Sequence, residues 1–342
     1  MQPFLDSTVV ADDTDELQFR AARDGYVFIR GLLPADAVEA LRRSLIAIAR
    51  EDGWVAADAP GGEPIAELDS FCLEPEPKYM KTMGRMYRLE AMHAIKHHDR
   101  LTGVIERVLG GPAVAHPRII PRAIFPQRDA YTTPPHQDFV PIQGTVDTYT
   151  AWMPLSDLPP AMGGLQLAAG SHQGEVFDFV PDLGAGGMRI TADFGDRWSY
   201  NPMQQGDVLI FHSLMVHQGV PNRSDRLRFS LDARYTRLSE PITPECTQPH
   251  TTPDMTWEQV YEDWPDTELK YYWKKLDLNF KEMDPSYYAK RDALAIELAE
   301  QGDVRSRSVL QRIIARDADP DKRRQAQKLL AQIDEAHPAY RR

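Results

Sequence analysis

Three residues near the middle of the chain have the types and spacing of metal ligands. His136 and Asp138 lie two positions apart in the run TTPPHQDFV, and His217 follows His136 by 81 residues, near the end of an apolar run. Two imidazoles and one carboxylate form the facial triad that binds non-haem iron(II) and leaves other coordination positions open. The sequence therefore predicts an iron(II) centre with room for a co-substrate and O2.

Arg228 adds a second chemical group to this centre. It follows His217 by eleven residues, in the run RLRFSLDAR. A guanidinium is always charged and binds a carboxylate in two-point geometry, so Arg228 is a candidate anchor for a dicarboxylate. Alternate side chains of a strand share a face, which places Ser230 and Arg226 on the same side as Arg228. Ser230 is a candidate hydroxyl donor to the same ligand, and the alternative for Arg228 is an ordinary surface arginine.

The ten histidines of the chain allow other ligand sets. An HxD pair is common, and His212 competes with His217 within one predicted strand, where residues five apart face opposite sides. On a strand, His136 and Asp138 would both point inward while Gln137 points away. The residues by themselves leave the choice between His212 and His217 open.

The pattern of apolar and turn-forming residues changes along the chain. Residues 15–52 show a helical period, a short β-rich run and a second helical period. From 113 to 237, short apolar runs alternate with clusters of Pro, Gly, Asp and Asn, which is typical of an all-β sandwich or barrel. Beyond residue 253 the pattern is helical again. The sequence predicts a mainly β core flanked by N-terminal and C-terminal α-helices.

The same pattern divides the chain into two expected units. Residues 1–250 contain the metal ligands and the β-rich stretch, and residues 251–342 form a helical extension. The last two helical runs are similar to one HEAT-type helix pair, and a single pair is not a stable array. We therefore expect the extension to pack on the core or on a second subunit, which would make the protein a homo-oligomer.

Composition excludes several classes of function. The 342 residues carry a net charge of −12, which argues against a broad nucleic-acid surface because phosphate binding needs clustered Lys and Arg. Cys72 and Cys246 form no CxxC pattern, so a reduced, cytoplasmic setting is expected. We recognise neither a signal peptide nor a run of ~20 apolar residues that would span a membrane. The expected partner is a small molecule, without nucleic acid or membrane.

Four segments, in order, resemble one enzyme family. They are RDGYVFIRGLLPADAVEALR, PPHQDF, GGLQLAAGSHQG and GDVLIFHSLMVHQGVPNRSDRLRFSLDARY, which together span about residues 20–237. They are similar to the opening, the HxD segment, the double-glycine turn and the distal-histidine segment of the phytanoyl-CoA dioxygenase-like iron(II)/2-oxoglutarate oxygenases. The resemblance implies a double-stranded β-helix, the jelly roll of cupin-like proteins. It also selects His217 over His212.

The resemblance assigns further roles by position. It implies that 2-oxoglutarate binds the iron and is held by Arg228, with Ser230, Trp152 and Thr150 in the same pocket. The alternative for Trp152 is core packing. Three residues on or near the strand before the HxD segment are left open as ligand contacts: Arg118, Arg122 and Gln127. His172 is not assigned to the metal, and Asn222 is expected to order the loop after His217.

One departure from the family pattern concerns the double-glycine turn. The chain has PPAMGG, without the acidic residue or Asn that often precedes the glycines. The resemblance places this segment at the cavity mouth, so the departure bears on substrate contacts and leaves the metal ligands untouched.

These features predict an Fe(II)- and 2-oxoglutarate-dependent dioxygenase that oxidises a C–H bond of a small molecule, releasing succinate and CO2. Asp138 favours hydroxylation or a related oxidation, because halogenating relatives lack this carboxylate. A role in natural-product metabolism is expected, and the substrate-binding residues stay unassigned. One alternative is an acyl-CoA or lipid hydroxylase, for which a modest basic group could serve: Lys78, Lys81, Arg85 and Arg88. Others are a cupin-type metalloenzyme without 2-oxoglutarate and a non-catalytic binding module.

Overall fold

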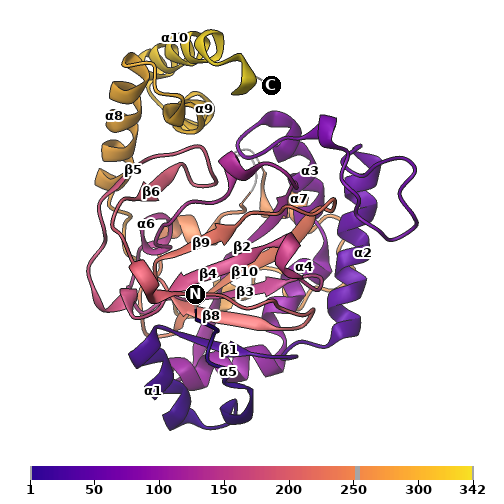
Figure 1. The fold of residues 1–342 in the computed structure, drawn as a ribbon. Coiled ribbons are helices and arrows are strands. Elements are labelled where there is room, and N and C mark those ends of the chain that lie inside the picture. The colour runs from indigo at the N-terminus through magenta and orange to yellow at the C-terminus, as the bar shows by residue number, and fades with distance from the viewer. Residues whose placement is uncertain (1, 251–254, 341–342) are drawn as a thin grey trace.

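The computed structural model describes residues 2–250 and 255–340 (Figure 1). The helices are α1 (Thr14–Asp24), α2 (Ala35–Glu51), α3 (Pro77–Tyr87), α4 (Glu90–Ala94), α5 (Asp99–Leu109), α6 (Phe139–Ile142), α7 (Trp257–Val260), α8 (Ser286–Glu300), α9 (Arg307–Arg316) and α10 (Pro320–Ala336). The strands are β1 (Tyr26–Ile29), β2 (Ala113–Ile124), β3 (Tyr149–Pro154), β4 (Gly164–Ala168), β5 (Phe179–Pro181), β6 (Met188–Ile190), β7 (Trp198–Ser199), β8 (Val208–His212), β9 (His217–Val220) and β10 (Arg228–Arg237).

The strands form antiparallel sheets of different sizes. A five-stranded sheet has the order β1-β8-β3-β10-β2, a three-stranded sheet has the order β7-β4-β9, and β5 pairs with β6. Strand β10 pairs with β2 on one side and with β3 on the other. The larger sheet therefore has a long central strand that can present several side chains to one ligand site.

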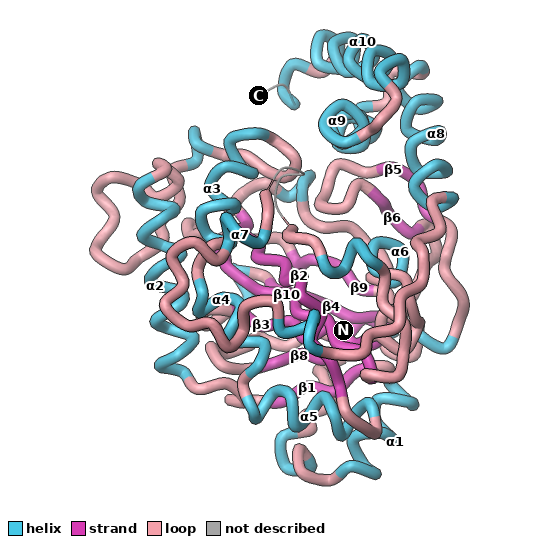
Figure 2. Tube along the Cα trace, turned by 180° about the vertical axis from the view of Figure 1, so that it is seen from behind, coloured by secondary structure: helices cyan, strands magenta, loops and turns pink. Residues whose placement is uncertain are grey.

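Alternation along the strands separates the two faces of the five-stranded sheet. One face, with Leu231 and Tyr235 of β10, packs in the main hydrophobic cluster with residues of α2, α3 and α5. The opposite face includes Trp152 of β3 and packs against Leu165 and Leu167 of β4 in a second cluster. The architecture is thus a helical layer, the five-stranded sheet and the smaller sheet (Figures 1 and 2). Polar side chains that point from β10 toward the smaller sheet enter the space between the sheets.

The expectation of a mainly β fold is wrong for the chain as a whole, because more residues lie in helices than in strands. The β-rich interval holds the strands as expected. Much of residues 170–200, however, is loop and 3-10 turn between short strands. The helices come from the stretch before 113 and from the stretch after 255. Antiparallel sheets flanked by helices at both ends of the chain are confirmed.

The C-terminal part packs in two different ways. Residues Trp257, Trp264 and Trp273 belong to the main hydrophobic cluster, so the expected boundary at 250–251 falls inside a continuous core. Helices α8, α9 and α10 share a separate apolar cluster and lie over the β5–β6 hairpin (Figures 1 and 2). Separate packing therefore begins with α8. Within the described residues, no helix is long and apolar enough to cross a membrane.

Candidate metal centre

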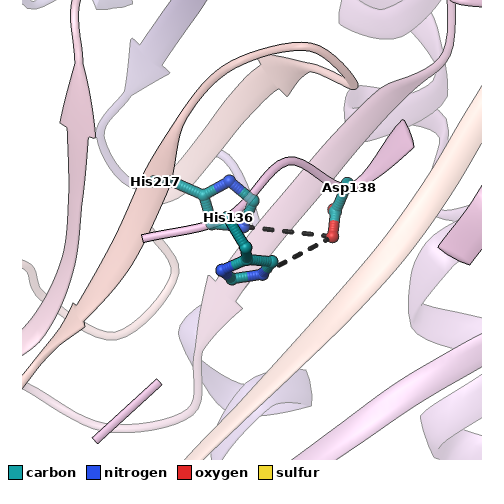
Figure 3. Close-up of side chains that lie close together, drawn as sticks. All are labelled: His136, Asp138 and His217. Atoms are coloured by element: carbon teal, nitrogen blue, oxygen red, sulfur yellow. Dashed lines mark ion pairs between the residues drawn. The ribbon is translucent and has the colours of Figure 1, made fainter. Parts of the chain in front are cut away.

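His136, Asp138 and His217 converge in the structure, as their types predict (Figure 3). The Asp138 Oδ1 lies 4.0 Å from the His136 Nε2 and 3.9 Å from the His217 Nε2. One potential ligand atom from each residue lies within 4.8 Å of the other two. The two imidazole rings have their centroids 4.1 Å apart. A single divalent cation fits among these three donors, which are the donor types of the facial triad.

Both imidazoles are oriented by the backbone. The His136 Nδ1 lies 2.8 Å from the Pro134 carbonyl oxygen, and the His217 Nδ1 lies 3.0 Å from that of Met215. Each Nδ1–H can donate to its carbonyl, which leaves Nε2 unprotonated and facing the other ligands. Burial lowers the pKa of His136 to about 3 and also lowers that of His217. Neutral imidazoles with free Nε2 lone pairs are the form that binds a metal.

Asp138 is held as a carboxylate in a buried setting. Thr150 donates to its Oδ2 at 2.6 Å, and Arg234 donates to both of its oxygens at 3.2 Å. Burial raises the pKa of Asp138, but the Arg234 charge, the two histidines and the Thr150 hydroxyl hold it well below the usual range. These neighbours fix the carboxylate beside the imidazoles and keep it ionised.

The local backbone differs from the expected strand. His136 forms an isolated bridge to His217, with backbone hydrogen bonds of 2.9 and 3.0 Å, whereas Asp138 adopts a helical conformation just before α6. The Gln137 side chain does point elsewhere, but it is buried, donating to the Leu214 carbonyl and accepting from the Phe177 N–H. A bridge followed by a helical turn, rather than a regular strand, brings the HxD pair to His217.

His212 is separated from the centre by a change of strand. It ends β8 of the five-stranded sheet, and a turn leads to His217 at the start of β9 in the smaller sheet. Its Nδ1 accepts from the Leu214 N–H at 3.1 Å, and its Nε2 lies 3.6 Å from Asp147. The expectation that both histidines share one strand is wrong, and His217 is the one in the cluster.

A small inner pocket lies between the sheets beside the two histidines. We define it by the lining residues His136, His217, Trp152, Arg228 and Ser230. Arg228 is 5% exposed and donates through Nη1 to the carbonyls of Met162 and Val220, at 3.0 and 2.9 Å. Its Nε has no hydrogen-bond partner within the described part of the chain. Burial lowers its pKa to about 10, so the guanidinium stays charged at neutral pH and retains donor capacity.

The double-glycine turn makes room for this guanidinium. Gly163 has φ +69°, and a Cβ there would overlap the carbonyl oxygens of Val220 and Pro221 and approach Arg228 Nη1 to 2.9 Å. Only glycine fits both the backbone conformation and the space. Gly163 of the PPAMGG run therefore leaves room for the Arg228 guanidinium.

The other expected pocket residues separate into two groups. Trp152 and Ser230 line the inner pocket, and Trp152 also packs in the second apolar cluster. Thr150 instead supports Asp138. Of the residues left open, Arg122 lines the inner pocket, while Gln127 donates to the Ser224 carbonyl outside it. The Asn222 side chain orders its loop through the Arg226 carbonyl and the Ser224 hydroxyl.

The sequence did not predict a buried ion-pair network that lies next to the metal ligands. Arg122 Nε donates to Asp232 Oδ2 at 2.8 Å, and Arg234 Nη2 lies 3.7 Å from the same oxygen while contacting Asp138. A usable signal was present, because the alternation that aligns Arg228 with Ser230 on β10 continues to Asp232 and Arg234. The inward face of β10 is thus polar along most of its length.

On the other side of His136 and Asp138 lies a larger outer cavity of about 440 Å³. Its sheet side includes Arg122 and Arg234, and its far wall is formed by the C-terminal helices α8 and α9. The volume is in the range of pockets for drug-sized ligands. The residues that α8 and α9 contribute are Tyr288, Arg291, Asp292, Arg312, Ile313 and Arg316.

The basic group at 78–88 does not face this cavity. Lys78 donates to the Ser70 carbonyl, Arg85 pairs with Asp52 at 2.6 Å, and Arg88 pairs with Asp263 at 3.2 Å. These contacts lie on the surface of α3 and just beyond it, where both arginines are matched by acids. The structure therefore gives no support to this group as a phosphate site.

Residues 21–230, more than half of the chain, match the phytanoyl-CoA dioxygenase (PhyH) family. The chain belongs to this family. Membership confirms the resemblance found in the sequence. Together with the His–Asp–His cluster it confirms the expected class of enzyme, a non-haem iron- and 2-oxoglutarate-dependent oxidoreductase. The match ends before the C-terminal helices.

Within the PhyH family, two relatives are 1-deoxypentalenic acid 11-beta-hydroxylases. The one from Streptomyces exfoliatus is 29% identical over 253 residues, covering 68% of this chain and 85% of that protein. The one from Streptomyces arenae is 28% identical over 250 residues, covering 68% and 84%.

Solved structures similar to this PhyH-family chain include an epimerase and a protein complexed with 2-oxoglutarate. The epimerase SnoN, in complex with Fe3+, alpha ketoglutarate and nogalamycin RO, has a TM-score of 0.46 and 22% identity, covering 68% of this chain and 87% of SnoN. EvdO2 from Micromonospora carbonacea var. aurantiaca, complexed with 2-oxoglutarate, has a TM-score of 0.45 and 18% identity, covering 64% of this chain and 89% of EvdO2.

Proposed function

We propose that this PhyH-family enzyme hydroxylates, or otherwise oxidises at a C–H bond, a mid-sized small molecule bound in the outer cavity, using Fe(II), 2-oxoglutarate and O2. The observation that carries the proposal is the position of the His–Asp–His cluster between two separate spaces. The inner pocket offers the buried guanidinium of Arg228 to a small dicarboxylate, and the outer cavity has the volume of a natural-product site.

The iron ligands are His136, Asp138 and His217. Their fit to the ion rests on two Nε2 atoms and one carboxylate oxygen that face one another. The Pro134 and Met215 carbonyls fix the imidazole orientation, and Thr150 and Arg234 fix the carboxylate. When bound, the iron supplies oxidative decarboxylation of 2-oxoglutarate to succinate and CO2 together with oxidation of the substrate.

Arg228 holds the far carboxylate of 2-oxoglutarate in the inner pocket. Its Nη1 is fixed by two carbonyls, so the guanidinium is pre-oriented and loses little freedom when the ligand binds. Ser230 shares the pocket wall and contributes a hydroxyl, while Trp152 contributes an apolar surface that excludes water. A charged pair in a dry pocket is stronger than one in solvent, which favours retention of the co-substrate.

The family assignment and the sheet order support a finer description of the fold. The five-stranded and three-stranded antiparallel sheets face one another with the ligands between them. We describe the pair as a double-stranded β-helix of the jelly-roll type with one short, loop-rich face. The helices that cover the other face of the larger sheet are additions to this core.

The expected substrate is a natural product or related metabolite rather than an acyl-CoA. The two relatives are named as hydroxylases of 1-deoxypentalenic acid, a small organic acid. The basic group that an acyl-CoA would need at 78–88 does not line the outer cavity, and its two arginines are paired with acids. Both observations favour a compact substrate inside the outer cavity.

The test is iron- and 2-oxoglutarate-dependent succinate formation by the purified protein, measured with and without Asp138→Ala. The expected result is succinate that requires Fe(II), 2-oxoglutarate and O2, and its loss in the variant together with loss of bound iron. Asp147→Ala is the control, because Asp147 is largely exposed and lies beside His212 instead. Succinate formation that persists in Asp138→Ala would contradict the proposal.

The same assay separates two rival functions. A cupin-type metalloenzyme without 2-oxoglutarate would bind iron and form no succinate. A non-catalytic module that binds through its C-terminal helices would bind neither iron nor 2-oxoglutarate. The three outcomes differ in iron content and in product, so one set of measurements distinguishes them.

A further inference from the structure

The outer cavity contains an unusual concentration of arginines. Six arginines and five carboxylates line it. One of the five is Asp138, an iron ligand in the proposed function. Three arginines are neutralised by pairing: Arg122 with Asp232 at 2.8 Å, Arg291 with Asp292 at 2.6 Å and Arg316 with Glu74 at 3.1 Å. Arg234 also pairs with Asp138 at 3.2 Å, and Arg118 donates to the Gln248 carbonyl at 3.1 Å, which leaves Arg312 to be considered.

Arg312 differs from the other five arginines of the cavity. It lies on α9, is 4% exposed, and donates through Nη1 to the carbonyl oxygen of Ser308 at 3.0 Å and to the Ser308 hydroxyl. Its Nη2 has no hydrogen-bond partner among residues 2–250 and 255–340. A buried guanidinium with an unsatisfied nitrogen is costly, so such a group calls for a partner that the chain itself does not supply.

Arg312 lines the outer cavity with the Nη1 side of its guanidinium already occupied. Ser308, one turn earlier on α9, fixes the Nη1 edge, and Gly187 of the β5–β6 hairpin packs against the same edge. A Cβ at Gly187 would lie 3.5 Å from Arg312 Nη1. The opposite edge is thus the one that remains for a ligand. A planar guanidinium with one edge fixed is pre-oriented for an oxyanion at the other.

We infer that Arg312 binds a carboxylate on the substrate, so that the C-terminal helices select an organic acid. This inference deepens the proposed function and rests on it, since the outer cavity is taken as the substrate site. The acid would enter with its carboxylate on α9 and its carbon skeleton toward His136 and Asp138. Binding is charge pairing without a covalent step.

The C-terminal extension then takes part in substrate binding. Residues 286–316 lie outside the family match at 21–230, yet they form the far wall of the cavity. Lys290 pairs with Asp178 at 2.6 Å and Arg316 with Glu74, which ties this wall to the core. The family segment would supply the oxidation chemistry, and the extension would supply recognition of the substrate.

The test is calorimetric binding to the protein loaded with Fe(II) and 2-oxoglutarate under anaerobic conditions. The probes are three acids, 1-deoxypentalenic acid, 1-naphthoic acid and decanoic acid, each compared with its own methyl ester. At least one acid should bind wild type roughly 30-fold or more tightly than its ester, as expected for a buried charge pair. Arg312→Gln should remove this preference while leaving binding of the ester and of 2-oxoglutarate unchanged.

Two further variants give the comparison its controls. Arg312→Lys keeps the charge but not the two-point geometry, so it should retain a reduced preference for the acid. Arg324→Gln removes an exposed arginine of α10 that pairs with Asp321 and should bind like wild type. If no acid binds more tightly than its ester to the wild type, or if folded Arg312→Gln keeps the preference, the inference is wrong.

The readout is independent of turnover. Arg312→Gln should still form succinate slowly without substrate, because it touches neither the iron ligands nor the inner pocket. Loss of acid preference with succinate formation intact supports the inference. Intact succinate formation with no acid preference in the wild type rejects the inference and leaves the proposed function standing. Absence of succinate in wild type rejects the proposed function instead.

Discussion

The inner pocket and the outer cavity meet at His136 and Arg122, which line both, and they differ in how they are built. The inner pocket is lined largely by strands β3, β9 and β10, and its residues fall within or next to short motifs. The outer cavity combines β2 with loops around 74 and 185 and with two helices at the end of the chain. The first is a product of strand alternation, and the second depends on how distant segments dock.

This difference follows the extent of the family match. The family match ends at residue 230, inside β10, and thus covers most of the inner pocket and none of α8 or α9. A fixed oxidant can be kept while the recognition wall changes. In that arrangement, variants of the inner pocket should affect every substrate, and variants of the outer cavity should affect only the choice of substrate.

The largest expected effect comes from one of the proposed iron ligands. His217→Ala should reduce bound iron to background and succinate formation by more than about 100-fold, since even residues that only orient ligands contribute 10–100-fold. His212→Ala is the matched control, because this histidine, at the end of β8, contacts Leu214 and Asp147 instead. Iron content and succinate are measured together. Iron retained in His217→Ala and lost in His212→Ala would move the centre to His212.

The next effect concerns the inner pocket by itself. Arg228→Gln should raise the KM for 2-oxoglutarate by roughly 30-fold or more, because a buried charge pair is lost, while bound iron stays unchanged. Arg226→Gln removes an arginine two residues earlier that pairs with Glu63 at 3.0 Å near the surface, and its KM should match wild type. Kinetics over a range of 2-oxoglutarate concentrations decide the point. Equal KM values for the two variants would remove Arg228 from the co-substrate site.

The sequence predicted the inner pocket well because its geometry is local. His217, Arg228 and Ser230 have fixed offsets, and alternation on a strand places Arg228 and Ser230 side by side. Thr150 lies two residues before Trp152 on the same strand, yet its hydroxyl donates to Asp138. The position of Asp138 depends on a helical turn that the periodicity of the sequence does not predict. The high helix content was not predicted, because the expectation of a mainly β fold rests on the β-rich middle of the chain.

The outer cavity was not predicted for a reason of distance in sequence. Arg312 lies more than 170 residues from Asp138, and nothing in the pattern of α9 distinguishes it from Arg307 or Arg316. The expectation that the extension packs on the core or on a second subunit named the alternatives without choosing a surface. Docking of α9 over the β5–β6 hairpin depends on tertiary contacts, so only coordinates bring Arg312 to the substrate side.

A smaller effect tests which side of the centre Thr150 serves. Thr150→Val removes the hydroxyl that donates to Asp138 Oδ2 and should weaken iron affinity by about 10-fold, with KM for 2-oxoglutarate unchanged. Thr148→Val is the control, since that buried hydroxyl donates to the Thr145 carbonyl instead. Metal titration and 2-oxoglutarate kinetics are both required. A raised KM with unchanged iron affinity would restore Thr150 to the co-substrate pocket.

The smallest effect should come from an acid that competes for the arginines of the outer cavity. Glu74 pairs with Arg316, and although burial raises its pKa, the charges of Arg312, His250 and Arg316 lower it to about 2, so it is ionised at neutral pH. Glu74→Gln should therefore strengthen binding of an organic acid by roughly threefold, because the attraction of Arg312 is no longer shared.

The control for this variant is Asp178→Asn, which removes an exposed acid paired with Lys290 on the outside of the same wall and should leave acid binding unchanged. Calorimetry with the same acids and esters provides the measurement. The gain in Glu74→Gln should be confined to the acids, since an ester has no charge to exploit the freed guanidinium. An equal gain for acid and ester would mean that the Glu74 side chain restricts the volume of the outer cavity rather than competing for its arginines. The outer cavity and the inner pocket would then differ in shape alone.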